Sequence, residues 1–134
     1  MAETLAALGS ESAWLVHGLG LDELTVAGEN QVTALKDGAV RTFSVTPEDA
    51  GLARAPVAAI KGGDAAFNAE ALLGVLRGAP SAYRDTVLLN AAAALVVSGR
   101  AGDLRDGVDQ AAGAIASGAA LNVLETMRRV STEA

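Results

Sequence analysis

The 134-residue chain contains no cysteine and only one histidine. Without cysteine it can form no disulfide, no thiolate metal site and no cysteine nucleophile. One histidine leaves little material for a histidine-based triad or a zinc site. The absence of disulfides is compatible with a cytoplasmic location, which is the location we expect.

Aromatic side chains and positive charge are also scarce. Aromatic residues make up 3% of the chain, so the core has to be built from Ala, Leu and Val. Sixteen acidic residues against ten Lys and Arg give a formal net charge of −6, whereas a nucleic-acid surface needs clustered cations. No apolar run reaches the roughly 18 residues that a membrane span requires. We therefore expect neither nucleic acid nor a membrane as a partner.

The residues that are present indicate one globular unit with an α/β fold. Hydrophobic residues account for 51% of the chain and charged residues for 19%, which is typical of a folded domain. Short apolar runs at 12–17 and 24–27 predict strands. Alternating runs at 31–35 and 40–45 flank Asp37-Gly38, a strong hairpin turn signal. The first half should therefore form a partial sheet with a short hairpin.

Helical patterns dominate the second half, beyond about residue 61. About four packed helices are predicted there, each beginning near a capping residue or after a glycine break. The helix over 83–97 is apolar almost all round and should be the most buried. Ser131–Ala134 should be a frayed end. The four predicted helices are Asp64–Arg77, Tyr83–Val97, the segment that follows Asp103, and Ala119–Val130.

The stretch from His17 to Thr25 is the first candidate site. An apolar run stops there at glycines, and two adjacent carboxylates follow, Asp22 and Glu23. Ligand-binding loops of α/β proteins often follow a strand, and Mg²⁺ is usually held by one or two carboxylates together with substrate phosphates. The residues alone leave open a solvated turn. His17 could act as an acid or base, or be a hydrogen-bonded structural residue.

Two further positions each allow a functional and a structural interpretation. Lys61-Gly62-Gly63-Asp64 precedes a helix and could form an anion site, but it lacks the spacing of known phosphate loops, and Asp64 can instead cap the helix. Asn90 lies on the apolar helix, where an amide is costly to bury unless it is paired. We expect it to tie down a loop or a neighbouring helix end, with a substrate role as the alternative.

Short motifs along the chain occur in the order found in one enzyme family. They are Leu8-Gly9-Ser10-Glu11, Val16-His17-Gly18, Gly20-Leu21-Asp22-Glu23-Leu24, Thr46-Pro47-Glu48-Asp49-Ala50-Gly51-Leu52, Gly62-Gly63-Asp64-Ala65, Asn68-Ala69, Leu76-Arg77-Gly78, Arg84-Asp85, Leu88-Leu89-Asn90-Ala91-Ala92-Ala93-Ala94-Leu95 and Ser117-Gly118-Ala119-Ala120-Leu121 with Leu124-Glu125. Each motif is modest, but their order and spacing cover essentially the whole chain. On these residues the chain resembles the catalytic domain of the anthranilate phosphoribosyltransferases.

This resemblance implies an enzyme that transfers phosphoribose from phosphoribosyl pyrophosphate to anthranilate in tryptophan biosynthesis. It also implies a fold shared with the class II nucleoside phosphorylases, and a homodimer for the full enzyme. In the family an Asp-Glu pair binds the Mg²⁺ that accompanies the diphosphate. Asp22 and Glu23 match that pair, so the resemblance implies that they are the metal ligands, with Mg²⁺ as the cofactor.

The chain departs from the family in its extent. It corresponds over residues 1–134 to the carboxy-terminal part of the larger α/β domain. The amino-terminal helical domain and the Gly-Thr-Gly-Gly-Asp loop that holds pyrophosphate have no counterpart. We therefore expect a segment that supplies metal ligands, has no catalytic residue of its own and is inactive alone. The alternatives are a segment of a nucleoside phosphorylase and a stand-alone binding module of the same fold.

Overall fold

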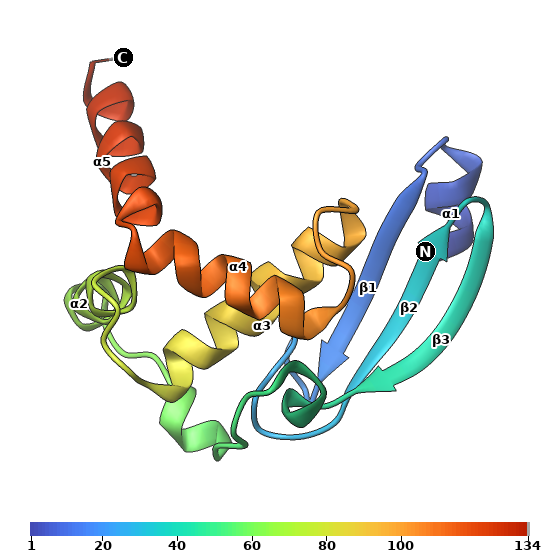
Figure 1. Cartoon of the computed structure of the whole chain (residues 1–134), viewed down its shortest axis with the longest axis horizontal. Helices are drawn as coiled ribbons and strands as arrows, with labels where there is room; N and C mark the ends of the chain where they lie inside the picture. Colours follow the sequence, from blue (N-terminus) through green and yellow to red (C-terminus); the bar gives the residue numbers. More distant parts are fainter. Residues whose placement is uncertain (134) are drawn as a thin grey trace.

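The computed structural model describes residues 1–133. Within that range a short helix precedes a three-stranded sheet, two single-turn 3-10 helices follow, and four longer helices complete the chain (Figure 1). The predicted order of a small sheet and then four helices is confirmed. The elements are α1 (Ala2–Ala7), β1 (Ser12–Gly18), β2 (Asn30–Lys36), β3 (Ala39–Val45), η1 (Pro47–Ala50), η2 (Val57–Ile60), α2 (Ala65–Leu76), α3 (Ala82–Val97), α4 (Leu104–Ala116) and α5 (Ala119–Thr132).

The sheet is antiparallel throughout, in the order β1-β2-β3. The predicted hairpin is confirmed, with its turn at Asp37 and Gly38, whose φ values are 50° and 78°. A two-residue turn with both φ values positive matches the twist of the strands that it joins. Strand β3 is largely exposed, and β2 alternates between buried and exposed positions at its start. The hairpin is thus half exposed, as its alternating polarity predicts.

The strand predicted over residues 24–27 is wrong. These residues form an irregular segment, although Leu24, Thr25 and Val26 are fully buried. An apolar run shows that a segment is buried but not how its peptide groups are satisfied. Here side-chain amides satisfy them: the Leu24 N–H donates to Asn90 and the Thr25 N–H donates to Asn30. A neighbouring strand is not needed.

The helices begin where their caps predict. Asp64 and Asp103 accept hydrogen bonds from the backbone N–H groups of Phe67 and Asp106 at 2.9 Å, so they cap α2 and α4. Among the helices of residues 1–133, α3 has the most buried residues, as predicted. The expected frayed end is wrong for the first residues of that segment, because α5 continues to Thr132; Ala134 lies outside the described residues.

Helix α3 is the centre of the packing. It lies along β1 and crosses α4 (Figure 1), where Gly107 lies against Ala92 so closely that an added methyl group would be 2.7 Å from the Ala92 Cα. The sheet, the buried irregular segment, α3 and α4 therefore share one core. Its buried members include Leu24, Val26, Val32, Ala34, Val45, Leu88, Leu89, Ala92, Leu104, Val108 and Ile115.

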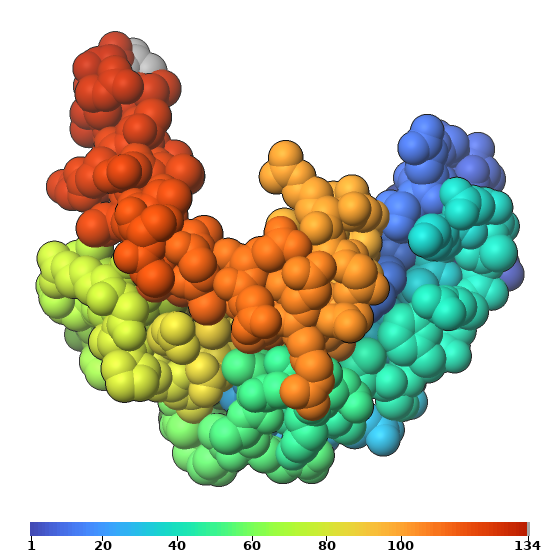
Figure 2. All heavy atoms as spheres, viewed as in Figure 1, coloured from blue at the N-terminus to red at the C-terminus, as the bar shows by residue number. Residues whose placement is uncertain are grey.

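Helix α5 stands away from this core. It has no buried residue, and it projects from the rest of the chain in both overall views (Figures 1 and 2). None of the helices within residues 1–133 has the combination of length and apolar character needed to cross a bilayer.

Candidate functional site

A tight turn directly follows β1 and leads into the two carboxylates. Gly18 and Leu21 pair with each other: the Gly18 N–H donates to the Leu21 carbonyl at 3.1 Å, and the Leu21 N–H donates back at 3.0 Å. Leu19 and Gly20 between them have φ values of 51° and 88°. Positive φ is unusual for leucine. The chain therefore reverses within two residues and presents Asp22 at a defined place just after the strand.

Asp22 and Glu23 are both exposed. The ion pairs found in residues 1–133 involve neither of them. No group of three or more His, Cys, Asp or Glu residues in the described part of the chain could hold a metal ion. A cation at this pair would therefore take most of its ligands from phosphate oxygens or water, which is the usual manner in which Mg²⁺ is bound. The donor set fits such an ion.

Two asparagines fix the backbone immediately after the acidic pair. The Asn90 side chain accepts from the Leu24 N–H at 3.0 Å and donates to the Leu24 carbonyl at 2.7 Å. The Asn30 side chain accepts from the Thr25 N–H at 2.7 Å and donates to the Thr25 carbonyl at 3.0 Å. The prediction that Asn90 ties down a loop is confirmed. The exposed acids are thus anchored to buried, fully hydrogen-bonded neighbours.

Asn30 is the residue that sequence reasoning missed. It is fully buried at the start of β2, and its amide also donates to the carbonyls of Gly28 and Val45 at 3.1 and 3.2 Å. The available signal was an asparagine just before an alternating strand pattern, and that signal is not distinctive. Its partners on the loop and on β3 become neighbours only after the sheet has formed.

Gly18 is also required by the packing of this loop. A Cβ atom at position 18 would overlap the Asn30 side-chain oxygen and would lie 2.9 Å from the Glu23 carbonyl oxygen. The backbone of Glu23 can therefore approach β1 only because residue 18 has no side chain. This glycine serves the internal packing of the acidic loop.

A cavity of about 310 Å³ opens beside Glu23. Its walls are partly apolar, with Leu21, Ile60 and Tyr83 among the lining residues, and Lys61 contributes a cation. The fold thus brings Glu23 and Lys61 to one cavity, although they are far apart in the sequence. A carboxylate and an ammonium group in one cavity suit a ligand that carries phosphate together with a cation.

The other predicted candidates do not join the site. Asp64 caps α2, and the Gly63 N–H and carbonyl both bond the Asn68 side chain, at 2.9 and 3.1 Å. The capping alternative is therefore confirmed, and the Gly63 N–H is already occupied. His17 is exposed. The structural alternative requires a hydrogen bond to its imidazole, and none is found within residues 1–133.

An exposed ion pair joins Glu48 to Arg54, next to a residue that bonds the buried segment of the loop. Arg54 donates to both carboxylate oxygens of Glu48, at 3.0 and 3.1 Å, and the neighbouring Ala55 N–H donates to the Val26 carbonyl at 3.1 Å. The hydrogen bond from Arg54 lowers the pKa of Glu48 from 4.5 to about 2, and the same bond raises the pKa of Arg54. Glu48 is therefore ionised throughout the range in which most proteins are folded.

Known proteins match the chain over almost its entire length. Residues 1–121 match the family described as "Glycosyl transferase family, a/b domain". An anthranilate phosphoribosyltransferase of Brucella ovis is 58% identical over 133 residues, which are 99% of this chain and 39% of the relative. The chain therefore spans about two fifths of the length of this curated relative.

Solved structures give the same result. The crystal structure of anthranilate phosphoribosyltransferase from Thermus thermophilus matches with a TM-score of 0.84 and 39% sequence identity, covering 93% of this chain and 37% of that one. The enzyme from Saccharomyces cerevisiae in complex with PRPP and Mg matches with a TM-score of 0.79 and 27% identity, covering 87% and 34%. The sequence family and the structural matches agree, and the chain therefore belongs to the glycosyl transferase family, as part of its α/β domain.

Proposed function

We propose that this chain is the part of an anthranilate phosphoribosyltransferase that supplies its Mg²⁺-binding carboxylates, Asp22 and Glu23. The observation that carries the proposal is an exposed acidic pair that takes part in no ion pair within residues 1–133 and whose Glu23 lines a cavity, in a chain 58% identical to such an enzyme over 133 residues. The substrates would be phosphoribosyl pyrophosphate and anthranilate. The relatives described above support this reading over a nucleoside phosphorylase segment.

The residues of this chain would hold and orient the phosphate end of the donor substrate. Mg²⁺ bound there would neutralise the negative charge of the departing diphosphate. Asn90 and Asn30 keep the backbone after the acids from moving, so the carboxylates need little reordering when the ion binds. Lys61, on the other side of the cavity, would offer a second positive charge to a phosphate oxygen.

The chain alone should not catalyse the reaction. It spans 39% of the relative's length, and the charged residues that line the cavity are Glu23 and Lys61 alone among those the structure describes. When the purified chain is incubated with both substrates and Mg²⁺, no phosphoribosylanthranilate should form. Formation of the product would contradict this part of the proposal and leave the metal assignment untouched. The homodimer expected for the full enzyme remains a prediction.

The metal assignment can be tested on the chain itself with Mn²⁺ as a paramagnetic substitute. In the presence of pyrophosphate, bound Mn²⁺ should broaden the amide resonances of residues 21–25 selectively. The double variant Asp22→Asn, Glu23→Gln keeps the shape of both side chains and removes both charges. It should weaken Mn²⁺ binding about tenfold or more, because one or two carboxylates are the protein's usual share of such a site.

The matched control is Glu70→Gln, which removes an exposed carboxylate from α2, on an element that does not carry the acidic loop. It should leave Mn²⁺ binding unchanged. Equal losses in the control and in the double variant would mean that the ion responds only to net charge. Broadening centred on any other segment would overturn the assignment to Asp22 and Glu23.

A further inference from the structure

One face of α3 carries polar side chains toward the acidic loop. Tyr83, Thr86 and Asn90 follow one another at spacings of three and four residues, which places them on one face of the helix. From residue 86 to its end, α3 contains no polar residue other than Thr86 and Asn90. Because Asn90 bonds Leu24, this face is directed at the backbone that follows the acidic pair.

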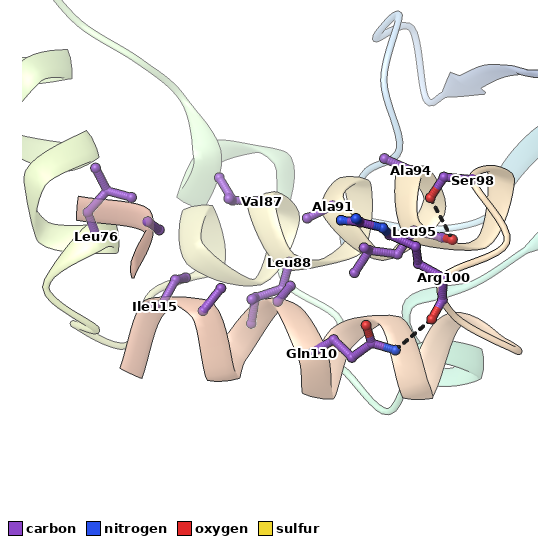
Figure 3. Close-up of a pocket in the computed structure, with 13 residues that line it drawn as sticks. Leu76, Val87, Leu88, Ala91, Ala94, Leu95, Ser98, Arg100, Gln110 and Ile115 are labelled. Carbon is purple, nitrogen blue, oxygen red and sulfur yellow. Dashed lines mark hydrogen bonds between the residues drawn. The ribbon is translucent and has the colours of Figure 1, made fainter. Parts of the chain in front are cut away.

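The neighbouring face of α3 is apolar. Val87, Ala91 and Leu95 line a separate cavity that α3 forms with α4 (Figure 3). Thr86 lies next to these positions and is only 4% exposed. A buried hydroxyl costs free energy unless it is hydrogen-bonded. Valine has the same shape without that cost, so packing alone does not call for a hydroxyl at this position.

Thr86 offers a hydrogen-bond acceptor to the cavity beside Glu23. The residue lines this cavity of about 310 Å³, and its hydroxyl donates to the Ala82 carbonyl at 3.0 Å. A hydroxyl has one hydrogen to donate and two lone pairs. Since the hydrogen is committed to Ala82, any ligand group that bonds this hydroxyl must itself donate.

Tyr83 offers a donor to the same cavity. Its ring packs against the core, and the residue lines the cavity together with Thr86 and Lys61. The phenolic hydroxyl makes no hydrogen bond within residues 1–133 and is not buried. A ligand in the cavity can therefore reach it and accept its hydrogen.

Three segments of this chain form the cavity. They are the acidic loop with Leu21 and Glu23, the 3-10 helix η2 with the two residues that follow it, and α3. The two hydroxyls of α3 thus share with Glu23 a space that the chain itself forms. A hydrated Mg²⁺ with a diphosphate complements both hydroxyls, because the waters that Mg²⁺ retains donate hydrogen bonds and the phosphate oxygens accept them.

We propose that α3 supplies two further ligand contacts to the metal–diphosphate site. The Tyr83 hydroxyl donates to a phosphate oxygen, and the Thr86 hydroxyl accepts from a water molecule on the ion. This inference rests on the proposed function, because it places the ion at Asp22 and Glu23. The same helix holds the acidic loop through Asn90, so the carboxylates and the two hydroxyls are held in one arrangement.

The single tyrosine of the chain is a built-in probe of this arrangement. Tyr83 is the only tyrosine and Trp14 the only tryptophan, so the ring resonances of each can be followed without ambiguity. Mn²⁺ with pyrophosphate should broaden the ring resonances of Tyr83 more strongly than those of Trp14, which does not line this cavity. Broadening of Trp14 that equals or exceeds that of Tyr83 would overturn the placement of α3 at the site.

Variants of the two hydroxyls test the contacts themselves. Tyr83→Phe removes one oxygen and should weaken the binding of pyrophosphate in the presence of Mn²⁺ about tenfold, as expected for a hydrogen bond to a charged group. Thr86→Val keeps the shape of the side chain and should weaken it about threefold. Thr86→Ser keeps the hydroxyl and should bind like the unmodified chain. Isothermal titration calorimetry measures the affinities, and circular dichroism checks the fold.

The matched control is Thr126→Val. The Thr126 hydroxyl donates to the Asn122 carbonyl at 2.9 Å, which is the same bond to the fourth preceding residue that Thr86 makes. Thr126 lies on α5, which contributes nothing to this cavity. The control should leave pyrophosphate binding unchanged. A loss as large as that of Thr86→Val would mean that the effect comes from the helix and would overturn the contact of Thr86.

The double variant Asp22→Asn, Glu23→Gln separates this inference from the proposed function. If it loses affinity while Tyr83→Phe and Thr86→Val bind like the unmodified chain, the proposed function stands and the contacts of α3 are overturned. If the double variant keeps full affinity, the proposed function fails and the inference fails with it. Full affinity in only one of the two α3 variants overturns the contact proposed for that residue.

Discussion

The side chain of Asn90 forms two hydrogen bonds with the peptide groups of a single residue, Leu24, at 3.0 and 2.7 Å. Its amide also donates to the Thr86 carbonyl one turn earlier in α3, at 2.9 Å. The two residues are 66 positions apart in the sequence, and they connect the central helix to the backbone that follows Asp22 and Glu23. The position of the acidic loop therefore depends on α3.

Asn90→Ala should destabilise the chain by about 2 kcal/mol, because it leaves the buried N–H and carbonyl of Leu24 without partners. It should also loosen the loop and weaken Mn²⁺–pyrophosphate binding, although it touches neither carboxylate. Urea unfolding and the amide resonances of residues 22–24 measure the two effects. The control is Asn122→Ala, an exposed asparagine of α5. Unchanged loop resonances in Asn90→Ala would show that the conformation of the loop does not depend on Asn90.

Gly18→Ala should displace the acidic loop through steric overlap alone. The new methyl group would lie 2.9 Å from the Glu23 carbonyl oxygen and would collide with Asn30, and such overpacking costs about 1–3 kcal/mol. At Gly102, a Cβ atom would meet nothing within 4 Å, so Gly102→Ala serves as the control. The unfolding temperature and the affinity for Mn²⁺ should both fall in Gly18→Ala and stay unchanged in Gly102→Ala. Equal behaviour of the two variants would contradict the close approach at Gly18.

Two glycines of α4 should respond in opposite directions to the same substitution. A Cβ atom at Gly107 would lie 2.7 Å from the Ala92 Cα, whereas at Gly113 it would meet nothing within 4 Å. Gly107→Ala should therefore separate α3 from α4 and destabilise the chain by about 1–3 kcal/mol. Gly113→Ala should stabilise it by up to about 1 kcal/mol through helix propensity. The midpoints of urea unfolding measure both effects. Stabilisation by both substitutions would contradict the close contact between α3 and α4.

The Glu48–Arg54 pair should make stability depend on pH in acid. The pKa of Glu48 is about 2 in the folded chain and 4.5 without its partners. As pH falls below 4.5, the unfolded chain takes up this proton first, so the contribution of Glu48 is present above pH 4.5 and is lost as pH falls through about 2. Glu48→Gln should flatten this part of the stability curve, measured by urea unfolding at a series of pH values.

The matched control for this pair is Glu70→Gln. Glu70 is exposed and takes part in none of the ion pairs found in residues 1–133. This variant should keep the acid slope of the unmodified chain. A slope that survives in Glu48→Gln would mean that other carboxylates are responsible for it.

Local patterns predicted most of the elements. Asp37-Gly38 fixed the hairpin, and Asp64 and Asp103 fixed two helix starts, because turns and caps depend on residues within a few positions of each other. The burial of α3 followed from its apolar composition. The strand expected at 24–27 failed because composition reports burial, while the hydrogen-bond partners of a buried peptide group can come from a distant side chain.

The sequence by itself determined the family, the hairpin and the four later helices, and the two acids proposed to bind a metal. The tertiary structure alone decided that Asn30 and Asn90 hold the loop behind those acids, that Lys61 shares a cavity with Glu23, and that Tyr83 and Thr86 of α3 line the same cavity. The reason is physical. Caps and turns join near neighbours in the sequence, whereas a buried amide acquires its partners, and a cavity its walls, only when segments far apart in the chain pack together.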